Sequence, residues 1–321
     1  MTHYRSAKGC SGEAGTDSPF NQRGCAWAED RVWYDFEGPR LPQMVSDAEV
    51  GMPEIAKGEF ARQSGVSATL EEDATLLHIV IDRPEGNVLT RSAMEHIAQV
   101  LAAHSADADL RLVLIRSAGR HFSFGVSIQE HQRDQVPAML TTFHSLVRQV
   151  ASYPVPVAAL VQGYCFGGAF ELVLCCHLVF ATPSAVFSCP EIKLGVIAPV
   201  LAVVGPLRLG SATAERLLLT GERLDAHATL RCGLVTKVLQ DGGPPEREFL
   251  LWYRKHLRPL SAFALRQATL AVRSGSTLLE SLERPLDRVE RQYVQEIVAS
   301  HDGNEGIAAF LERRDPVWRN S

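Results

Sequence analysis

Residues 155–172 read VPVAALVQGYCFGGAFEL, and three elements can be recognised in them. The apolar, valine-rich part that ends at Val161 is typical of a strand buried on both faces. The glycines that follow it, Gly163, Gly167 and Gly168, allow backbone angles that other residues resist and let a ligand come close to the main chain. Beyond them the apolar residues take the spacing of a helix. The stretch therefore predicts a strand, a glycine turn and a helix.

A helix that begins at this turn would present unpaired N–H groups there, and preorganised N–H donors can hold an oxyanion. Glu171 falls within the first turn of the same helix, where the helix dipole favours a carboxylate, yet its neighbours are apolar. Two interpretations stay open on these residues alone. The turn is either an oxyanion site with a functional carboxylate, or a tight packing turn with an ordinary N-terminal charge.

Length and composition limit the possible classes of protein. The 321 residues, 46% of them hydrophobic, are accounted for by one α/β core with extensions. A net charge of −5 gives no basic field for a nucleic acid or an anionic membrane. No apolar stretch reaches the length of a membrane span, and the N-terminal residues lack the apolar region of a secretory signal. We therefore expect a cytoplasmic protein that binds neither nucleic acid nor membrane.

The cysteines and histidines give no sign of a metal site. The seven cysteines are an odd number without a CxxC pair, and most of them lie in apolar runs. Such cysteines are typical of reduced core positions in a cytosolic protein. The 11 histidines show neither HExxH nor another ligand spacing.

Strands and helices alternate from Leu76 onward, which indicates a parallel sheet. The loop at 119–129 contains Gly125 and follows the second strand. Ligands bind such sheets beyond the carboxyl ends of the strands, so the Gly125 loop and the Gly168 turn should meet. Before the stretch quoted first, the predicted order is a strand at 76–82, a helix at 92–104, a strand at 112–116 and a helix at 137–152.

Residues 1–65 mix glycines, charges and isolated aromatic residues without a sustained period. They predict an extension that is disordered or loosely packed, with docking through Trp27 and Trp33 as the alternative. Met44 and Met52 are alternative start positions.

Beyond the glycine turn, short strands are predicted at 178–181 and 186–188, and Glu191 follows them in an apolar loop. A carboxylate among such apolar residues is either functional or an ordinary charge on a solvent-facing loop. The chain after Val200 is mostly helical, with a lone strand at 235–239. The predicted helices span 200–209, 212–219, 226–232, 246–256, 261–273, 277–300 and 305–313.

From about Leu76 to its end the chain resembles the crotonase family, the enoyl-CoA hydratases and isomerases, in the order and spacing of short motifs. Any one of these motifs is weak, whereas seven in sequence are specific. They are DRP at 82–84 with NVL at 87–89, FSFGVSI at 122–128, GYCFGGAFEL at 163–172, PEIKLG at 190–195, LTG at 219–221, GLV at 233–235 and EGIAAFLERR at 305–314.

The resemblance implies an α/β fold of the ClpP/crotonase type, with repeated ββα units and a C-terminal helical region. It divides the chain into the extension at 1–65, a core at 66–258 and a helical trimerisation region at 259–321. It further implies a homotrimer or a dimer of trimers, which binds an acyl-CoA substrate and needs no metal or redox cofactor.

The resemblance also assigns roles to single residues. The backbone N–H groups of Val126 and Gly168 would form the oxyanion hole for the thioester carbonyl oxygen, which becomes enolate-like during the reaction. Glu171 and Glu191 fall on the positions of the two glutamates that hold and activate water in the family's hydratases. The residues expected around the substrate and coenzyme A are Phe124, Gly125, Ser127, Gln129, Gly167 and Ala198, with Phe310 and Arg313 from the last helix of a neighbouring subunit.

Hydration is favoured because both glutamates are present, whereas isomerases of the family often keep only one. The chain departs from the common family pattern at Ser127 and in an apolar loop at 197–208, which together with the bulky Phe124 indicates a reshaped acyl pocket. In these regions it is most similar to the branch of cyclohexa-1,5-diene-1-carbonyl-CoA hydratases, so a cyclic dienoyl-CoA is the expected substrate. The alternatives are isomerisation or thioester hydrolysis on the same fold, or a non-catalytic scaffold or RNA-associated homologue.

Overall fold

The computed structural model describes residues 59–240 and 243–321. All of them belong to one unit of the chain, Asp47–Ser321. Residues 1–58 of the predicted extension at 1–65 lie outside the described residues, and so do both alternative start positions.

The sheet begins earlier in the chain than the sequence predicts. The expectation that regular structure starts at Leu76 is wrong, because β1 (Glu59–Gln63) and β2 (Val66–Glu71) precede it. These strands pair antiparallel, and Ser64 and Gly65 turn the chain between them with positive φ values. Polar residues interrupt both strands, so they lack the continuous apolar run that marks a fully buried strand.

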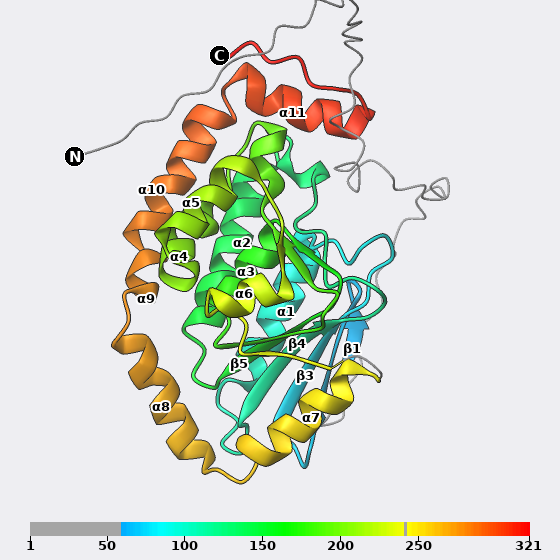
Figure 1. Cartoon of the computed structure of the whole chain (residues 1–321), viewed down its shortest axis with the longest axis vertical. Helices are drawn as coiled ribbons and strands as arrows, with labels where there is room; N and C mark the ends of the chain where they lie inside the picture. The colour runs from blue at the N-terminus through cyan, green and yellow to red at the C-terminus, as the bar shows by residue number, and fades with distance from the viewer. Residues whose placement is uncertain (1–58, 241–242) are drawn as a thin grey trace, which may run out of the picture. The chain divides into compact units, whose positions relative to one another are not determined.

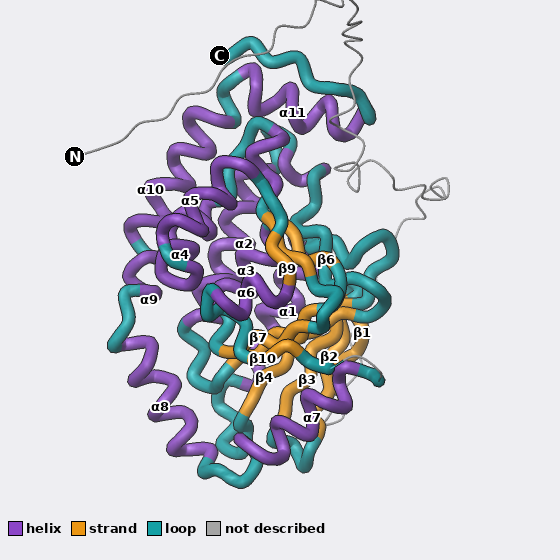
Figure 2. Tube along the Cα trace, viewed as in Figure 1, coloured by secondary structure: helices purple, strands orange, loops and turns teal. Residues whose placement is uncertain are grey.

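The main sheet of the described residues has the strand order β1-β2-β3-β4-β5-β7-β10 (Figures 1 and 2). From β3 to β10 all neighbouring strands are parallel, as the alternation of strands and helices predicts. The central β5 is buried at every position, which explains its continuous apolar sequence. The bounds are β3 Leu76–Ile81, β4 Leu112–Ser117, β5 Val157–Val161, β7 Leu178–Ala181 and β10 Lys237–Val238.

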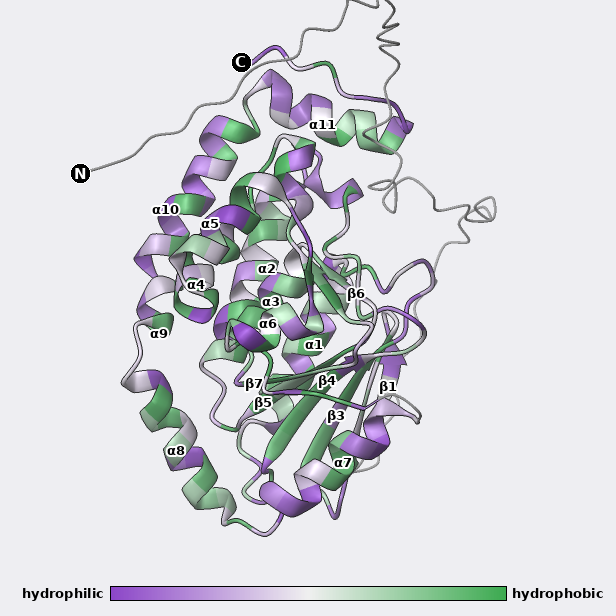
Figure 3. Cartoon of the chain, viewed as in Figure 1, coloured by the Kyte–Doolittle hydropathy of each residue, from purple (hydrophilic) through white to green (hydrophobic). Residues whose placement is uncertain are grey.

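Apolar cores lie on both faces of this sheet, because side chains alternate between the faces along each strand. Leu112 and Leu114 of β4 pack with α7 (Pro245–His256) on one face. Val113 and Ile115 belong to the larger core on the other face. In Figure 3, β3 and β4 are hydrophobic along most of their length. The larger core includes residues of α1 Arg91–His104, α2 Val136–Ala151, α3 Gly168–Cys175 and α4 Pro199–Leu209.

A second, smaller sheet has the order β6-β8-β9. The strand predicted at 186–188 is confirmed as β8 (Val186–Ser188), whereas the sequence predicts neither the sheet nor its other two strands. These strands, β6 (Tyr164–Phe166) and β9 (Leu224–Asp225), have three residues or fewer, too short to show a period. The strand predicted at 235–239 is also not a lone one, because β10 pairs with β7 and extends the main sheet. β6 leads from β5 into the glycine turn, so the small sheet supports that turn.

The C-terminal region is helical, as predicted, but its longest expected helix is broken. The range 277–300 forms α9 (Leu278–Ser281), α10 (Arg284–Gln292) and a π-helical turn, η4 (Tyr293–Ile297). A proline in the first turn of α10 explains the break, because proline cannot donate the hydrogen bond of a continuous helix. No helix of the described residues is long and apolar enough to cross a membrane. The remaining helices are α5 Ser211–Thr220, α6 Ala226–Arg231, α8 Ala262–Ser274 and α11 His301–Glu312.

Candidate active site

The Gly125 loop and the glycine turn before α3 lie against each other, as the sequence predicts. A Cβ atom placed on Gly125 would lie 2.9 Å from the carbonyl oxygen of Phe166 and 3.5 Å from the Gly168 nitrogen. Gly125 has φ +104° and Gly167 has φ +54°, values that favour glycine. Glycine is therefore needed here both for the backbone angles and for the close approach of two main chains.

Two backbone N–H groups are left unused where these turns meet. Leu89 N donates to Gly125 O at 2.8 Å, and Ser127 N donates to Leu89 O at 3.0 Å, so the N–H of Val126 between them points away from Leu89. Gly168 is the first residue of α3. Among the described residues, neither the Val126 nor the Gly168 N–H donates to a protein acceptor. The two residues are in contact, because a Cβ atom on Gly168 would lie 2.5 Å from Val126 Cγ2.

Glu171 is a buried carboxylate held by the start of another helix. The residue is 3% exposed, and Oε1 accepts hydrogen bonds from Val200 N at 2.7 Å and Leu201 N at 2.9 Å. These N–H groups belong to the first turn of α4, where the helix dipole favours an anion. Burial nevertheless raises the pKa of Glu171 to about 7, although both hydrogen bonds act to lower it.

Glu191 lies in the 3₁₀ turn η3 (Pro190–Leu194), against the glycine turn. A Cβ atom on Gly167 would lie 2.7 Å from Glu191 Oε1, so this carboxylate touches the same main chain that carries the Gly168 N–H. The residue as a whole is half-buried, whereas its Oε2 is fully enclosed and has no hydrogen-bond partner among the described residues. Burial first, and then the charge of Glu171, raise the pKa of Glu191 to about 8.

The two glutamates therefore share one poorly solvated enclosure. Like charges in such a place cannot both ionise freely, so the pair releases its protons in separate steps. At neutral pH one carboxyl group can accept a proton while the other still carries one. Together with the two free amides, the site offers an oxyanion cradle, a general base and a general acid. This set is suited to reactions through an enolate-like anion.

The other residues predicted around the substrate lie on the same loops. Phe124 is half-buried, and its ring packs near Tyr164 and Phe166. Ser127 is buried, and its hydroxyl donates to Gln129 Oε1 at 3.0 Å. Gln129 itself is exposed at the start of a short 3₁₀ turn, η2 (Gln129–His131).

Ala198 is 1% exposed and is the N-cap of α4, the helix that holds Glu171. Phe310 is half-buried near the end of α11, and Arg313 is the exposed C-cap of the same helix. α11 packs on η3 of its own chain, where a Cβ atom on Gly306 would overlap the carbonyl oxygen of Leu194. The contribution of Phe310 and Arg313 to a neighbouring subunit stays a prediction.

Some residues that shape the site are not apparent from their local sequence. The amides of Val200 and Leu201 bind Glu171. The proline at the first position of α4 is a sequence signal for the start of that helix, where such amides are free to bind an anion. Asn87 is 5% exposed with φ +54°, and its Nδ2 donates to the carbonyl oxygens of Ala118 and His121. Asn87 thereby fixes the loop that leads to Gly125.

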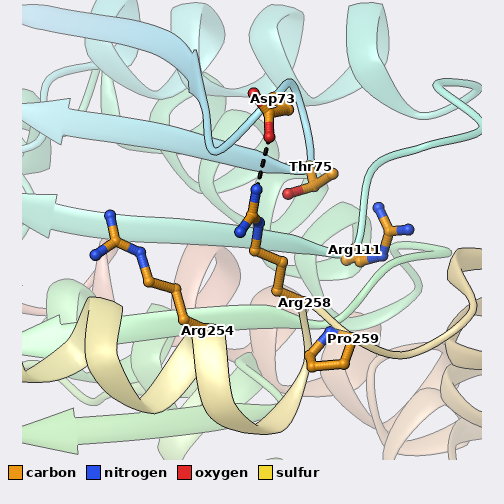
Figure 4. A pocket seen from close by; sticks show the side chains of 6 residues that line it. All are labelled: Asp73, Thr75, Arg111, Arg254, Arg258 and Pro259. Carbon is orange, nitrogen blue, oxygen red and sulfur yellow. Dashed lines mark hydrogen bonds and ion pairs between the residues drawn. The ribbon is translucent and has the colours of Figure 1, made fainter.

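A separate hollow of about 470 Å³ lies away from the glutamates (Figure 4). Thr75 and Arg111, two of its lining residues, immediately precede β3 and β4, so the hollow is at the amino ends of the strands. Its three arginines are engaged in the fold, since Arg254 pairs with Glu72, Arg258 pairs with Asp73, and Arg111 donates to the carbonyl oxygen of Leu260. The hollow is therefore not the place where the loops and glutamates converge. Among the described residues, no three His, Cys, Asp or Glu side chains gather as ligands for a metal ion.

A family model described as enoyl-CoA hydratase/isomerase matches residues 71–321, most of the chain. The chain belongs to the enoyl-CoA hydratase/isomerase family. This match confirms the resemblance and the crotonase-type α/β fold that the sequence predicts. The family also establishes the protein as an enzyme of the enoyl-CoA hydratase type, with an acyl-CoA as its class of substrate.

Relatives of known name and structure agree with this assignment. Cyclohexa-1,5-dienecarbonyl-CoA hydratase of Thauera aromatica is 40% identical over 257 residues, which are 80% of this chain and 98% of that protein. Carnitinyl-CoA dehydratase of Citrobacter koseri is 30% identical over 256 residues, 76% of this chain and 95% of that protein. A crystal structure of an enoyl-CoA hydratase from Mycobacterium avium subsp. paratuberculosis has a TM-score of 0.69 at 29% identity, covering 80% of this chain and 99% of that one.

Proposed function

We propose that this protein adds water to a conjugated acyl-CoA thioester, with a cyclic dienoyl-CoA as its substrate. The observation that carries the proposal is the pair of enclosed carboxylates, Glu171 and Glu191, placed beside two free backbone amides. Water bound in an apolar enclosure needs polar partners, and two carboxyl groups provide them.

The amides of Val126 and Gly168 hold the thioester oxygen in this proposal. Addition of water to the double bond drives negative charge onto that oxygen, and fixed N–H donors stabilise it without reorganisation. The loss of one such donor in other enzymes reduces kcat by about 10²–10³-fold. The reaction is redox-neutral, and the amides supply the electrophilic assistance, so the proposed chemistry requires no metal or redox cofactor.

The two glutamates divide the proton transfers. Glu171 accepts two backbone N–H bonds that stabilise its ionised form, whereas Glu191 Oε2 has no such donor among the described residues. Glu171 is therefore the base that takes a proton from water, and Glu191 is the acid that delivers a proton to carbon. The oxygen of the water bonds to a carbon of the double bond, and the electron pair of that bond moves toward the thioester. The proton from Glu191 then bonds to the carbon that received this electron pair.

Two features support a cyclic acyl group. The relative from Thauera aromatica, 40% identical, is named for a cyclohexadiene thioester. Phe124 and the Ala198 segment, which depart from the common pattern of the family, place an aromatic ring and a small buried residue on loops that border the site. Such apolar walls suit a flat ring.

A panel of linear and cyclic enoyl-CoA thioesters tests this proposal. We expect the absorbance of the conjugated thioester to fall without release of free thiol, and kcat/KM to be at least about tenfold higher for a cyclic dienoyl-CoA than for a linear enoyl-CoA of similar size. Free thiol release would indicate hydrolysis and would refute hydration. A preference for the linear thioesters would refute the cyclic substrate.

We also propose a homotrimer or a dimer of trimers in a reducing cytoplasm. Helix α8 exposes Phe263 and Val272, which are 71% and 66% exposed, and such large apolar side chains favour burial against another surface. The buried cysteines, among them Cys165 and Cys189, are unpaired thiols, which suits a reducing compartment. Light scattering of the purified protein should give the mass of three or six chains, and a monomer would refute the assembly.

A further inference from the structure

The π-helical turn η4 begins with Tyr293, and its phenol is unusual in this fold. Val298 N donates to Tyr293 O at 2.9 Å, which closes the wider turn. π-helical turns are rare and occur often at functional sites. Tyr293 is 2% exposed, and its hydroxyl has no hydrogen-bond partner among the described residues. Buried polar groups normally have a partner, so this hydroxyl calls for an explanation.

Other buried phenols of the chain are satisfied by the protein. Tyr153 donates to the carbonyl oxygen of Leu101 at 2.8 Å, and Tyr253 donates to Thr75 Oγ1 at 2.7 Å. The fold therefore does provide acceptors for phenols that serve only its stability. Tyr293 differs from both.

The turn η4 joins α10 and α11, and each of these helices packs on an element next to one of the glutamates. Before it, α10 packs on α4, the helix whose first turn holds Glu171 (Figure 1). After it, α11 packs on η3, which contains Glu191. His144 Nδ1 of α2 lies 2.6 Å from Glu290 Oε2 and fixes α10 one turn before Tyr293. The helices on both sides of η4 are thus held next to the elements that surround the glutamates.

The electrostatics agree with this placement. Burial, then the charge of Glu191, then that of Glu171, raise the pKa of the Tyr293 phenol. The phenol therefore lies within the field of both carboxylates and stays a neutral O–H group at any working pH. Glu191 Oε2 and the Tyr293 hydroxyl are both enclosed and both without a protein partner among the described residues. Buried polar atoms normally have a partner, so two such atoms that influence each other electrostatically indicate that each contacts a ligand.

We propose that Tyr293 is a third functional residue of the site, whose hydroxyl donates a hydrogen bond to the oxygen atom of the water that is added to the substrate. This inference rests on the proposed hydration. One O–H of the water donates a hydrogen bond to the Glu171 carboxylate, which takes its proton, and the other donates to the unprotonated oxygen of the Glu191 carboxyl group. One lone pair of the oxygen then faces the substrate carbon, and the phenol holds the other. In the reverse direction the same O–H stabilises the departing hydroxide.

The variant Tyr293→Phe removes only the hydroxyl and keeps the ring in the core. We expect kcat to fall about 10- to 100-fold while KM for the acyl-CoA stays within about twofold, because the lost contact is to the water and not to the thioester. We expect Tm to stay unchanged or to rise, since the substitution removes a buried hydroxyl without a protein partner. The pH dependence of kcat should keep its shape, because the phenol does not titrate in the measured range.

Tyr253→Phe is the matched control, since it deletes the same atom where the fold uses it. Its Tm should fall and its kcat should be retained. Full activity of Tyr293→Phe, together with inactivity of Glu171→Gln and Glu191→Gln, would overturn the role of Tyr293 and leave the proposed function in place. Full activity of all three variants would instead refute the proposed function itself. A rise in KM alone, or a lower Tm for Tyr293→Phe, would reduce Tyr293 to a packing residue and overturn the inference.

Discussion

Replacing Glu191 by glutamine should abolish hydration and at the same time stabilise the protein in alkaline solution. In the folded protein, burial and the charge of Glu171 raise the pKa of Glu191 from its ordinary value of 4.5 to about 8. Below about pH 4.5 the residue is protonated in both the folded and the unfolded chain. As the pH rises to about 8, the unfolded chain releases this proton and the folded chain retains it. The free energy of unfolding therefore falls over this interval and levels off above it.

The size of this penalty follows from the displaced pKa. A rise from 4.5 to about 8 corresponds, at about 1.4 kcal/mol per pH unit, to about 5 kcal/mol at pH 9. This figure is an upper limit, because Glu171 and Glu191 titrate together and share the penalty. Glutamine has the same shape and no charge to bury. We therefore expect Glu191→Gln to gain about 2 kcal/mol or more at pH 9 and less than about 1 kcal/mol at pH 5.

Urea unfolding at pH 5 and pH 9, at one fixed protein concentration, measures this difference, and the hydration assay is run on the same samples. Glu248→Gln is the matched control, because its carboxylate has a pKa lowered mainly by the hydrogen bond from Lys237. That variant should lose stability at pH 9 and keep its activity. An equal effect of Glu191→Gln at both pH values, or a loss of stability at pH 9, would show that Glu191 is solvated and would refute the enclosed pair.

Three further outcomes are expected. Glu171→Gln should lower the pKa of Glu191, because the variant lacks the charge at position 171 that helps to raise this pKa. NMR of the carboxyl groups measures the shift, and an unchanged pKa would place the two residues far apart. Gly167→Ala should reduce kcat/KM about tenfold or more, because alanine resists φ +54° and its Cβ would press on Glu191 Oε1 at 2.7 Å; normal kinetics would contradict the contact. Gly306→Ala should lower stability by about 1–3 kcal/mol in urea unfolding, since its Cβ would overlap the carbonyl oxygen of Leu194; an unaltered midpoint would show that α11 does not rest on η3.

The parts of the fold that follow from the sequence are those with a strong local pattern. β5 is apolar at every position and is followed by glycines, so its burial and the turn after it could be predicted. The meeting of the Gly125 loop with that turn follows from the rule that parallel strands end at one edge of a sheet. These features have causes within a few residues of the chain.

The features that the sequence did not reveal depend on contacts far along the chain. The edge hairpin of β1 and β2 has polar interruptions, and β6 and β9 of the second sheet have three residues or fewer, so none of these strands shows a period. The enclosure of Glu191 depends on packing with a distant part of the chain, and Tyr293 approaches the glutamates only because η4 lies between α10 and α11. The resemblance to the family identified the two acids, but their raised pKa values are a property of the packed structure.

The most direct test of the central claim is to run the reaction in water enriched in heavy oxygen and to locate the label by mass spectrometry. Hydration by Glu171 and Glu191 predicts one labelled oxygen on the acyl carbon skeleton, an intact thioester, and no label in Glu171→Gln or Glu191→Gln. Label in a released carboxylate would show hydrolysis. A shifted double bond without label would show isomerisation, and either result would contradict the account.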